Sequence, residues 1–400
     1  MDQIIETELQ FGPYIYHPLP VVLTRGEGCY VWDTAGKRYL DMMSAYSAVS
    51  HGHAHPRLVK ALQQQAAKLS VVSRAFYTDR LAPFLQRACE LSGMDKALPM
   101  NTGVEAVETA LKTARKWAYE TKNVPADKAE VIVCRGNFHG RTITAIAMSS
   151  EPKYRKNFGP FAPGFRQIDF GDAAALQNAI NTNTAAFLVE PIQGEGGIIV
   201  PPDGYLASCA EICRRNNVLL ICDEIQTGLG RTGRLLASEH DGIKPDGVLL
   251  GKALGGGLYP VSMFLARREL LDIFAPGDHG STFGGNALAA TVGLEALNVL
   301  VDEKLVENSQ TMGTYLQQGL RSLDSPLITE VRGRGLLIGI EIDPARASAR
   351  SVCEHLMEQG ILTKETQQTV VRLAPPLIID RPTADLALQT IGNTLKQLAA

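Results

Sequence analysis

The chain has 400 residues, 45% of them hydrophobic and 20% charged, which is typical of a globular protein long enough for two domains. The formal net charge of −3 and the lack of any basic run argue against a nucleic-acid partner. No segment is apolar for long enough to cross a membrane, and the acidic N-terminus lacks a signal or transit pattern. The seven scattered cysteines favour reduced thiols, so we expect a cytoplasmic protein.

The first predicted element is a small antiparallel ribbon over residues 20–41. Val21–Leu23 and Cys29–Trp32 have strand character and flank two glycines. Asp33–Gly36 then predicts a turn into a third short strand, Arg38–Leu40.

A histidine-rich segment, His51–His55, follows the ribbon and resembles a metal-binding cluster. It leads through Pro56 into a predicted helix and has no matching set of cysteines or carboxylates. We therefore expect these histidines to support neighbouring residues, with no metal. A metal hydrolase stays open as an alternative from a different class.

From residue 56 onward, predicted helices alternate with short apolar strands. Apolar runs without alternation suit strands that are covered on both faces, and this order is typical of an α/β fold with a parallel sheet. The predicted helices are 58–69, 104–119 and 206–215, and the predicted strands are 131–133, 186–189, 218–222 and 248–250.

After about residue 290 the pattern changes to a smaller α+β region. Long helices are predicted over 287–301 and 305–323, followed by strands over 336–342 and 370–373 and a C-terminal helix. We expect three parts: an N-terminal segment (1–45) that packs with the small domain, a large domain (46–290) and a small domain (291–400).

Asn101–Glu105 marks the start of the helix predicted from residue 104. Thr102 and Glu105 have the spacing of a capping box. Gly103 would let a phosphate approach the free N–H groups, where the helix dipole also favours an anion. A capping box alone is usually only a cap.

Two loops that follow predicted strands carry candidate ligand-binding groups. Gly136–Thr142 places Phe138 and Arg141 between glycines, which suits a ring-stacking residue and a clamp for a carboxylate. Glu190–Gly197 has glycines that let backbone pack close to a ligand. Alternatively, the first loop is a polar surface loop, and the glutamates of the second are solvated charges.

Gly228–Gly233 matches the dinucleotide-binding pattern literally. It begins several residues after its strand, and the sequence that follows is a poor opening for a long helix. We therefore discount the match, while a nucleotide-dependent oxidoreductase stays open as an alternative.

Asp223 and Lys252 each end a predicted buried strand. Ligands of parallel sheets bind at the carboxyl ends of the strands. Pyridoxal phosphate needs a lysine to hold it and an acid to keep a proton on its pyridine nitrogen. On these two residues alone, an ordinary ion pair at the strand ends would be the better interpretation.

Taken together, the motifs resemble those of the class III (omega) aminotransferases, which are fold-type I pyridoxal-phosphate enzymes, over essentially the whole chain. The resemblance implies a large domain with a mostly parallel seven-stranded sheet, a smaller α+β domain, pyridoxal phosphate as cofactor and an aminotransferase activity. The segments that carry it are Asn101–Gly103, Asn137–Thr142, Asp223–Gly228 and Gly251–Ala253.

The resemblance also implies how the cofactor is bound. Lys252 is implied to hold it covalently and to move the proton, and Asp223 to keep the pyridine nitrogen protonated. Gln226 is implied to bind the phenolic oxygen and Phe138 to stack on the ring, with His139 also among the cofactor-binding residues. The implied phosphate contacts are Gly103, Val104, Ser281 and Thr282, the last two from the neighbouring subunit of a homodimer.

Within the family the closer resemblance is to members that transfer the δ-amino group of L-ornithine to 2-oxoglutarate. One departure concerns His139, where animal members of that group carry tryptophan and many members acting on acetylornithine carry histidine. Acetylornithine or another ω-amine is therefore the alternative donor. The closer resemblance rests on Tyr14–Pro20, Ser44–Val49, Ser73–Tyr77, Gly280–Asn286 and Arg372–Leu377.

One site would have to bind ornithine with its α-carboxylate far from the reacting carbon and glutamate with a carboxylate close to it. Arg372 and Glu195 match the residues that are implied to switch between these modes, with the glutamate masking the arginine while ornithine is bound. Arg141 and Tyr16 match those that hold the distant carboxylate, and Tyr46 is also expected to contact substrate.

Overall fold

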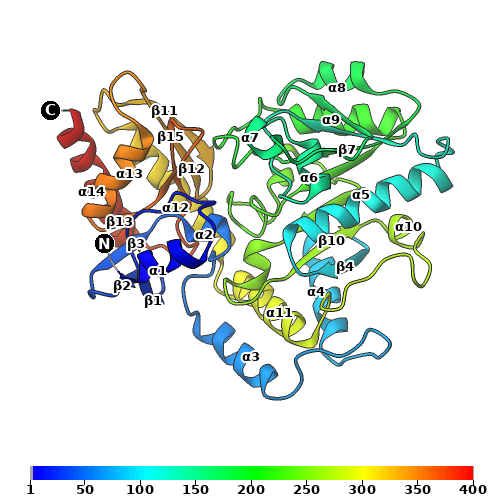
Figure 1. Ribbon diagram of the computed structural model, residues 1–400, viewed down its shortest axis with the longest axis horizontal. Coiled ribbons are helices and arrows are strands. Elements are labelled where there is room, and N and C mark those ends of the chain that lie inside the picture. Colours follow the sequence, from blue (N-terminus) through cyan, green and yellow to red (C-terminus); the bar gives the residue numbers. More distant parts are fainter. Residues whose placement is uncertain (1–2, 400) are drawn as a thin grey trace.

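The computed structural model describes residues 3–399. Its largest sheet has seven strands in the order β4-β10-β9-β8-β7-β5-β6 (Figure 1). The strands from β9 to β6 are parallel to their neighbours, whereas β10 is antiparallel to β9 and β4. This confirms the expected α/β fold with a mostly parallel sheet. The strands are β4 Lys96–Met100, β5 Glu130–Cys134, β6 Phe165–Ile168, β7 Thr184–Val189, β8 Leu219–Asp223, β9 Gly247–Leu250 and β10 Ser262–Ala266.

Helices cover both faces of this sheet. Because alternate residues of a strand point to opposite faces, Leu219 and Ile221 of β8 pack under α5, whereas Leu220 and Cys222 pack under α8 and α9. Each of these strand residues is at most 2% exposed, so truncating one to alanine is expected to cost about 2–5 kcal/mol. The covering helices are α5 Gly103–Glu120, α8 Ala173–Ala179 and α9 Tyr205–Arg215.

Two four-stranded sheets lie to the left in Figure 1. One has the order β11-β12-β15-β14, and the other completes the N-terminal ribbon with a strand from the C-terminal region, because β13 pairs in parallel with β3. The ribbon strands are β1 Leu23–Glu27, β2 Tyr30–Asp33, β3 Arg38–Asp41 and β13 Ile361–Leu362. The other sheet contains β11 Ile328–Arg334, β12 Leu337–Ile342, β14 Lys364–Thr366 and β15 Val370–Leu373.

The region after residue 280 also contributes long helices, and one of them crosses the expected limit of the large domain at residue 290. A single apolar cluster extends from Met263 of β10 through Leu297 to Ile338 of β12, so the two regions share buried core. The expected limits at 45 and 290 therefore stay a prediction. The helices are α11 Ala287–Asp302, α12 Leu305–Arg321, α13 Ala349–Glu358 and α14 Arg381–Ala399.

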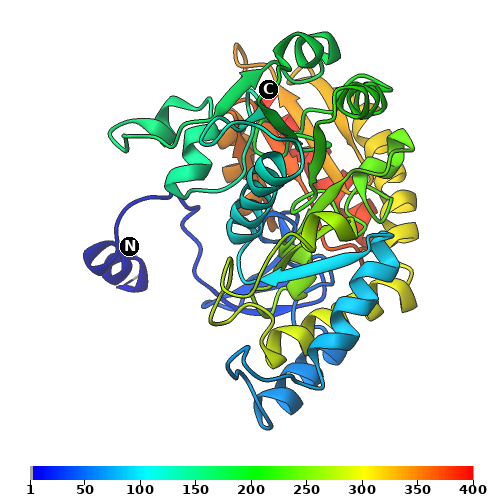
Figure 2. The ribbon, with the colours of Figure 1, turned by 90° about the vertical axis from the view of Figure 1, so that its right-hand side faces the viewer.

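The N-terminal helix α1, Gln3–Phe11, has no buried residue and stands away from the body of the chain in Figure 2. An extended segment connects it to β1, and on this segment Tyr16 is 68% exposed. Within residues 3–399, no helix is both long and apolar enough to cross a membrane.

The loop Gly228–Gly233 forms turns and joins distant parts of the chain. Its Arg231 is fully buried and donates hydrogen bonds to Leu336 O at 3.1 Å, Pro375 O at 2.6 Å and the Ser50 hydroxyl at 2.9 Å. The loop that matches the dinucleotide-binding pattern therefore connects distant parts of the chain through buried hydrogen bonds.

Each histidine of His51–His55 has a protein partner. His51 pairs with Ala296 O at 2.9 Å, His53 with Asp41 at 2.7 Å and His55 with Glu303 at 3.2 Å. In the part of the chain that the structure describes, no group of three or more potential metal ligands converges.

Candidate active site

A cavity of about 190 Å³ lies at the carboxyl ends of the parallel strands. Asp223 ends β8, Lys252 follows β9, and the N-terminus of α5 forms a wall. The structure thus brings together residues that are far apart in the sequence, at the edge where a parallel sheet binds its ligand. Of the predicted site residues, Gly103, Val104, Phe138, His139, Glu195, Asp223, Gln226 and Lys252 line this cavity.

Lys252 has a backbone conformation that side chains rarely adopt, with a φ of 44°. It opens the 3₁₀-helix η2, Lys252–Gly255, directly after β9. Burial lowers the pKa of the Lys252 amine, and Arg372 adds to that shift, against the attraction of Glu195. A lowered pKa makes the neutral, nucleophilic amine more accessible near neutral pH.

Asp223 is paired with a buried histidine. Its Oδ2 lies 2.8 Å from His139 Nδ1, and its Oδ1 accepts a hydrogen bond from Ile225 N at 3.1 Å. Burial alone would lower the pKa of His139, but the hydrogen bond and charge of Asp223 raise it overall. The imidazole is therefore favoured as a cation next to the Asp223 carboxyl group. Among residues 3–399, His139 Nε2 has no hydrogen-bond partner.

Glu190 lies next to this pair and was missing from the predicted site. Its Oε2 accepts a hydrogen bond from Phe138 N at 3.0 Å, which helps to fix the Phe138–His139 backbone. Burial raises the pKa of Glu190 to about 7, while His139 opposes the shift. The interpretation of Glu190 as a solvated loop charge is wrong, because only 7% of the residue is exposed.

Glu195 and Arg372 form a bidentate ion pair at the edge of the cavity. Arg372 Nη1 lies 2.6 Å from Glu195 Oε1, and Nη2 lies 3.0 Å from Oε2. Although burial opposes it, Arg372 lowers the pKa of Glu195 to about 2. Such a pair fixes the guanidinium plane and occupies the donors that could bind another carboxylate.

Gln226 reaches the same ion pair, with its Nε2 3.3 Å from Glu195 Oε1. Its Oε1 has no hydrogen-bond partner within residues 3–399. Gly194 makes room for this side chain, because a Cβ at Gly194 would lie 1.4 Å from Gln226 Oε1. Because Gly194 has no side chain, the glycine-rich loop packs against Gln226 as well as against the cavity.

The N-terminus of α5 has the expected capping box. Thr102 N donates to Glu105 Oε2 at 2.7 Å, and Glu105 N donates to the Thr102 hydroxyl at 3.4 Å. Gly103 packs on Ile225, because a Cβ added at Gly103 would lie only 3.0 Å from the Ile225 side chain. A free helix N-terminus with a glycine at this point suits a phosphate.

The residues expected to bind substrate lie close to residues that line the cavity or to one another. The Arg141 Cζ lies 5.4 Å from the centre of the Phe138 ring, and the Arg372 Cζ lies 5.2 Å from that of Tyr46. Burial raises the pKa of Tyr46, and Glu195 and Tyr16 add to the shift, so these groups lie near one another.

Ser281 and Thr282 lie outside the cavity that Lys252 lines. They contribute to a separate hollow together with residues 71–74. The Ser281 hydroxyl accepts a hydrogen bond from Asn101 Nδ2 at 3.0 Å, close to the start of α5. Their expected phosphate contact stays a prediction.

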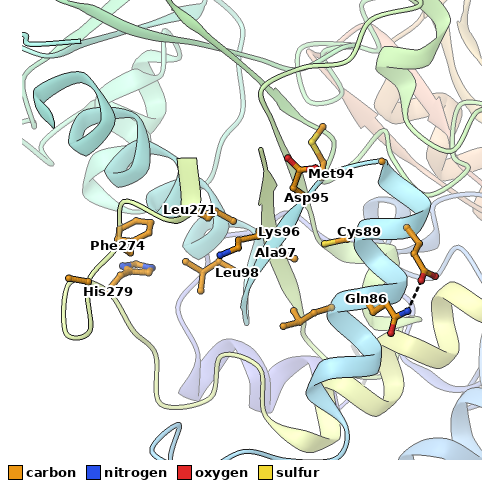
Figure 3. Close-up of a pocket in the computed structure, with 14 residues that line it drawn as sticks. Gln86, Cys89, Met94, Asp95, Lys96, Ala97, Leu98, Leu271, Phe274 and His279 are labelled. Carbon is orange, nitrogen blue, oxygen red and sulfur yellow. Dashed lines mark hydrogen bonds between the residues drawn. The ribbon is translucent and has the colours of Figure 1, made fainter. Parts of the chain in front are cut away.

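A larger hollow of about 760 Å³ has different chemistry (Figure 3). Figure 3 shows Phe274 and His279 on one side and Gln86 and Cys89 of α4, Leu81–Ser92, on the other. Its Lys96 is paired with Asp272, and none of the predicted site residues lines it. The small cavity around Lys252 is the better candidate because ionisable groups with shifted pKa values converge there.

Comparison with known proteins places these residues in a family. A family model described as aminotransferase class-III matches residues 12–395. Ornithine aminotransferase 2 of Staphylococcus aureus is 54% identical over 395 residues, which cover 99% of each chain. Ornithine aminotransferase of Bacillus subtilis is 53% identical over 394 residues, which cover 98% of each chain.

Solved structures agree with the sequence matches. The crystal structure of the ornithine aminotransferase from Toxoplasma gondii matches with a TM-score of 0.98 at 46% identity, covering 99% of this chain and 95% of that chain. The acetylornithine aminotransferase from Elizabethkingia anophelis matches with a TM-score of 0.90, also at 46% identity, covering 98% of both chains.

Proposed function

Because the chain belongs to the class-III aminotransferases, which use pyridoxal phosphate, we propose that it transfers the δ-amino group of L-ornithine to 2-oxoglutarate. The products are glutamate 5-semialdehyde, which cyclises to pyrroline-5-carboxylate, and glutamate. The observation that carries this proposal is the Glu195–Arg372 ion pair beside the buried Lys252 amine.

The donor set of the cavity fits pyridoxal phosphate. It offers an amine, a buried carboxylate, a helix N-terminus and an aromatic ring, and Gln226 Oε1 and His139 Nε2, which lack a hydrogen-bond partner within residues 3–399, can bind polar groups. When bound, the cofactor supplies an electron sink for the carbon that loses a proton. We assign the phosphate to the start of α5, and the ring to the space between Phe138 and Asp223.

Different side chains of the cavity then have different roles in the reaction. Lys252 Nζ moves a proton to and from the carbon that bears the amine, as its lowered pKa allows. Asp223, positioned by its hydrogen bond with His139, would keep a proton on the pyridine nitrogen of the bound cofactor. Phe138 would stack on the ring of the bound cofactor, and Gln226 would bind its phenolic oxygen.

Arg372 and Glu195 solve the problem of two binding modes. While they are paired, Arg372 does not attract a carboxylate, so ornithine binds with its α-carboxylate at Arg141 and Tyr16 and its δ-carbon near Lys252. When Glu195 swings away, Arg372 binds the α-carboxylate of glutamate or 2-oxoglutarate. Tyr46 lies against Arg372 and limits where that carboxylate sits.

A second candidate donor is N-acetylornithine. It is favoured by His139 and by the 46% identity to an acetylornithine aminotransferase. An amino-donor panel of ornithine, N-acetylornithine, 4-aminobutyrate and lysine, with 2-oxoglutarate as acceptor, separates the two. We expect ornithine to have the highest kcat/KM, and a clear preference for N-acetylornithine would overturn the proposal.

We also propose a homodimer in which Ser281 and Thr282 reach the neighbouring subunit's phosphate site. Exposed aromatic side chains near these residues support it, since Phe76 is 69% exposed and Phe283 is 49% exposed. We place the protein in the cytoplasm, as supported by its seven free cysteines, of which all except Cys89 are buried.

A further inference from the structure

Tyr154 makes close contact with a residue of the substrate site. It lies on α7, Pro152–Arg155, a short helix that sequence analysis did not identify. The Arg141 Cζ lies 3.5 Å from the centre of the Tyr154 ring. The same ring meets Phe138 edge-on, with centroids 6.1 Å apart and an interplanar angle of 82°.

The backbone on both sides of this contact is anchored. Arg141 directly precedes Thr142, the N-cap of α6, Ile143–Met148, and Thr142 donates a hydrogen bond to Glu108 at 2.6 Å. At the other end of α6, Arg155 donates to Ala147 O at 2.7 Å. One short helix therefore carries Arg141 at its start and fixes the segment with Tyr154 at its end.

The guanidinium of Arg141 is available to a ligand. Within residues 3–399, Arg141 forms no ion pair with a carboxylate, and the residue is exposed. A free arginine side chain has many rotamers, and ordering them on binding costs entropy. A ring against the flat face of the guanidinium restricts the rotamers and leaves the N–H edge free for a planar carboxylate.

Tyr154 also interacts electrostatically with charged residues of the same site. Burial raises the pKa of its phenol above the ordinary value, Arg141 opposes the shift, and Glu195 adds to it. The ring is therefore neutral near pH 7 and presents an electron-rich face to Arg141.

We propose that Tyr154 is a positioning residue that holds Arg141 ready for the distant carboxylate of the substrate. The inference rests on the proposed function, in which Arg141 binds the α-carboxylate of ornithine. It adds a determinant of selectivity: the preference for ornithine over the same diamine without a carboxylate depends on an aromatic ring at position 154.

The test uses the holoenzyme and compares ornithine with 1,4-diaminobutane, which is ornithine without its carboxylate. Tyr154→Leu should raise the KM for ornithine about fivefold, the upper end expected for a cation–π contact at an exposed arginine, with kcat changed less than about twofold. Its kinetics with 1,4-diaminobutane should not change. Tyr154→Phe keeps the ring and should behave as the wild type.

Phe158→Leu is the matched control, because Phe158 lies four residues further on and is 57% exposed. It should leave both substrates unaffected. If Tyr154→Leu impairs ornithine and 1,4-diaminobutane equally, Tyr154 has only a structural role and the inference is wrong. A Tyr154→Phe variant as impaired as Tyr154→Leu would also overturn it, because the hydroxyl and not the ring would then matter.

A binding measurement separates this inference from the proposed function. Glutarate has two carboxylates and no amine, so calorimetry reports its affinity without any turnover. Weaker glutarate binding by Tyr154→Leu than by Phe158→Leu supports the role of Tyr154, and equal binding overturns it. A wild type that does not accept ornithine would overturn the proposed function instead.

Discussion

Glu190 is a carboxyl group buried beside a second carboxylate, Asp223, and a histidine. Burial disfavours its charged form, and Asp223 adds to that effect, whereas the cation of His139 opposes it. Glu190 accepts a hydrogen bond from Phe138 N and so holds the backbone beside the Asp223–His139 pair.

We predict that Glu190→Gln changes how stability depends on pH. The folded-state pKa of about 7 lies above the ordinary 4.5, so between these values the carboxyl group has lost its proton in the unfolded chain but keeps it in the fold, and the free energy of unfolding falls as the pH rises. The variant lacks this titration. Its free energy of unfolding relative to the wild type should therefore increase by about 1–3 kcal/mol from pH 4.5 to 7.

Chemical denaturation at several pH values measures this difference. Glu307→Gln on the exposed side of α12 is the control and should show a difference from the wild type that does not vary with pH. A difference that is equally flat for Glu190→Gln would mean that Glu190 is already ionised in the fold at low pH.

The Glu195–Arg372 pair leads to a prediction about the two half-reactions. Arg372→Ala removes the partner of an α-carboxylate, so it should slow the 2-oxoglutarate and glutamate half by about 30-fold or more, equivalent to about 2 kcal/mol. Glu195→Ala unmasks Arg372, so ornithine should bind increasingly through its α-amine, and the glutamate half should speed up relative to the ornithine half. Stopped-flow single turnovers of each half-reaction measure both effects.

These variants test the switch itself and not general damage to the site. Equal losses in both halves, for both variants, would show that the two residues are only scaffold. The low pKa of Glu195, about 2, implies that the pair persists down to acidic pH. The ratio between the half-reactions should therefore not change between pH 6 and 8 through protonation of Glu195.

At this scale the sequence predicts residues whose chemistry is distinctive and whose position follows a strand. Lys252 and Asp223 meet both conditions, and the structure brings them to one cavity. Glu190 also follows a strand, but only its burial reveals that it is not a solvated charge. Tyr154 carries no motif, and its contact with Arg141 depends on how α6 and α7 fold back on each other.

At the scale of elements, we expect the buried hydrogen bonds of Arg231 to stabilise the contact between the loop Gly228–Gly233 and the C-terminal region of the chain. Arg231→Met would leave the carbonyl groups of Leu336 and Pro375 buried without their donor, so we expect a loss of about 3–5 kcal/mol in unfolding free energy. Arg234→Met is the control, because Arg234 lies in the same loop and is exposed. Urea denaturation followed by circular dichroism measures both, and equal small losses would contradict the assigned role.

Four of the inner strands were predictable, whereas the inner strand β10 and the outer strands β4 and β6 were not. β5, β7, β8 and β9 are apolar on both faces and stand out as short hydrophobic runs. β6, Phe165–Ile168, is an edge strand with polar residues, and β4 contains Pro99, which is tolerated because β4 also lies at an edge. Sequence patterns reflect burial, so edge strands that contain polar residues or a proline give a weak signal.

At the scale of the whole molecule, one chain leaves part of its expected site incomplete. Ser281 and Thr282 are predicted to bind phosphate, yet they lie outside the cavity with Lys252. Exposed apolar side chains surround this loop, including Val71 and Phe283, which are 36% and 49% exposed. A second copy of the chain that covers this surface would bring each loop to the other copy's cavity, in the reciprocal manner of a two-fold dimer.

This arrangement predicts that two inactive variants rescue each other. Lys252→Ala removes the essential amine, and Thr282→Glu places a negative charge where a phosphate is expected, so each homodimer should be inactive. A mixed dimer contains one site with both changes and one with neither, so it should have about half the wild-type activity. The two variants are co-expressed with different tags, and the mixed dimer is isolated by sequential affinity steps. If an intact mixed dimer is inactive although Thr282→Glu alone abolishes activity, the loop acts within its own chain. If Thr282→Glu alone is fully active, the loop does not contact the phosphate in either subunit.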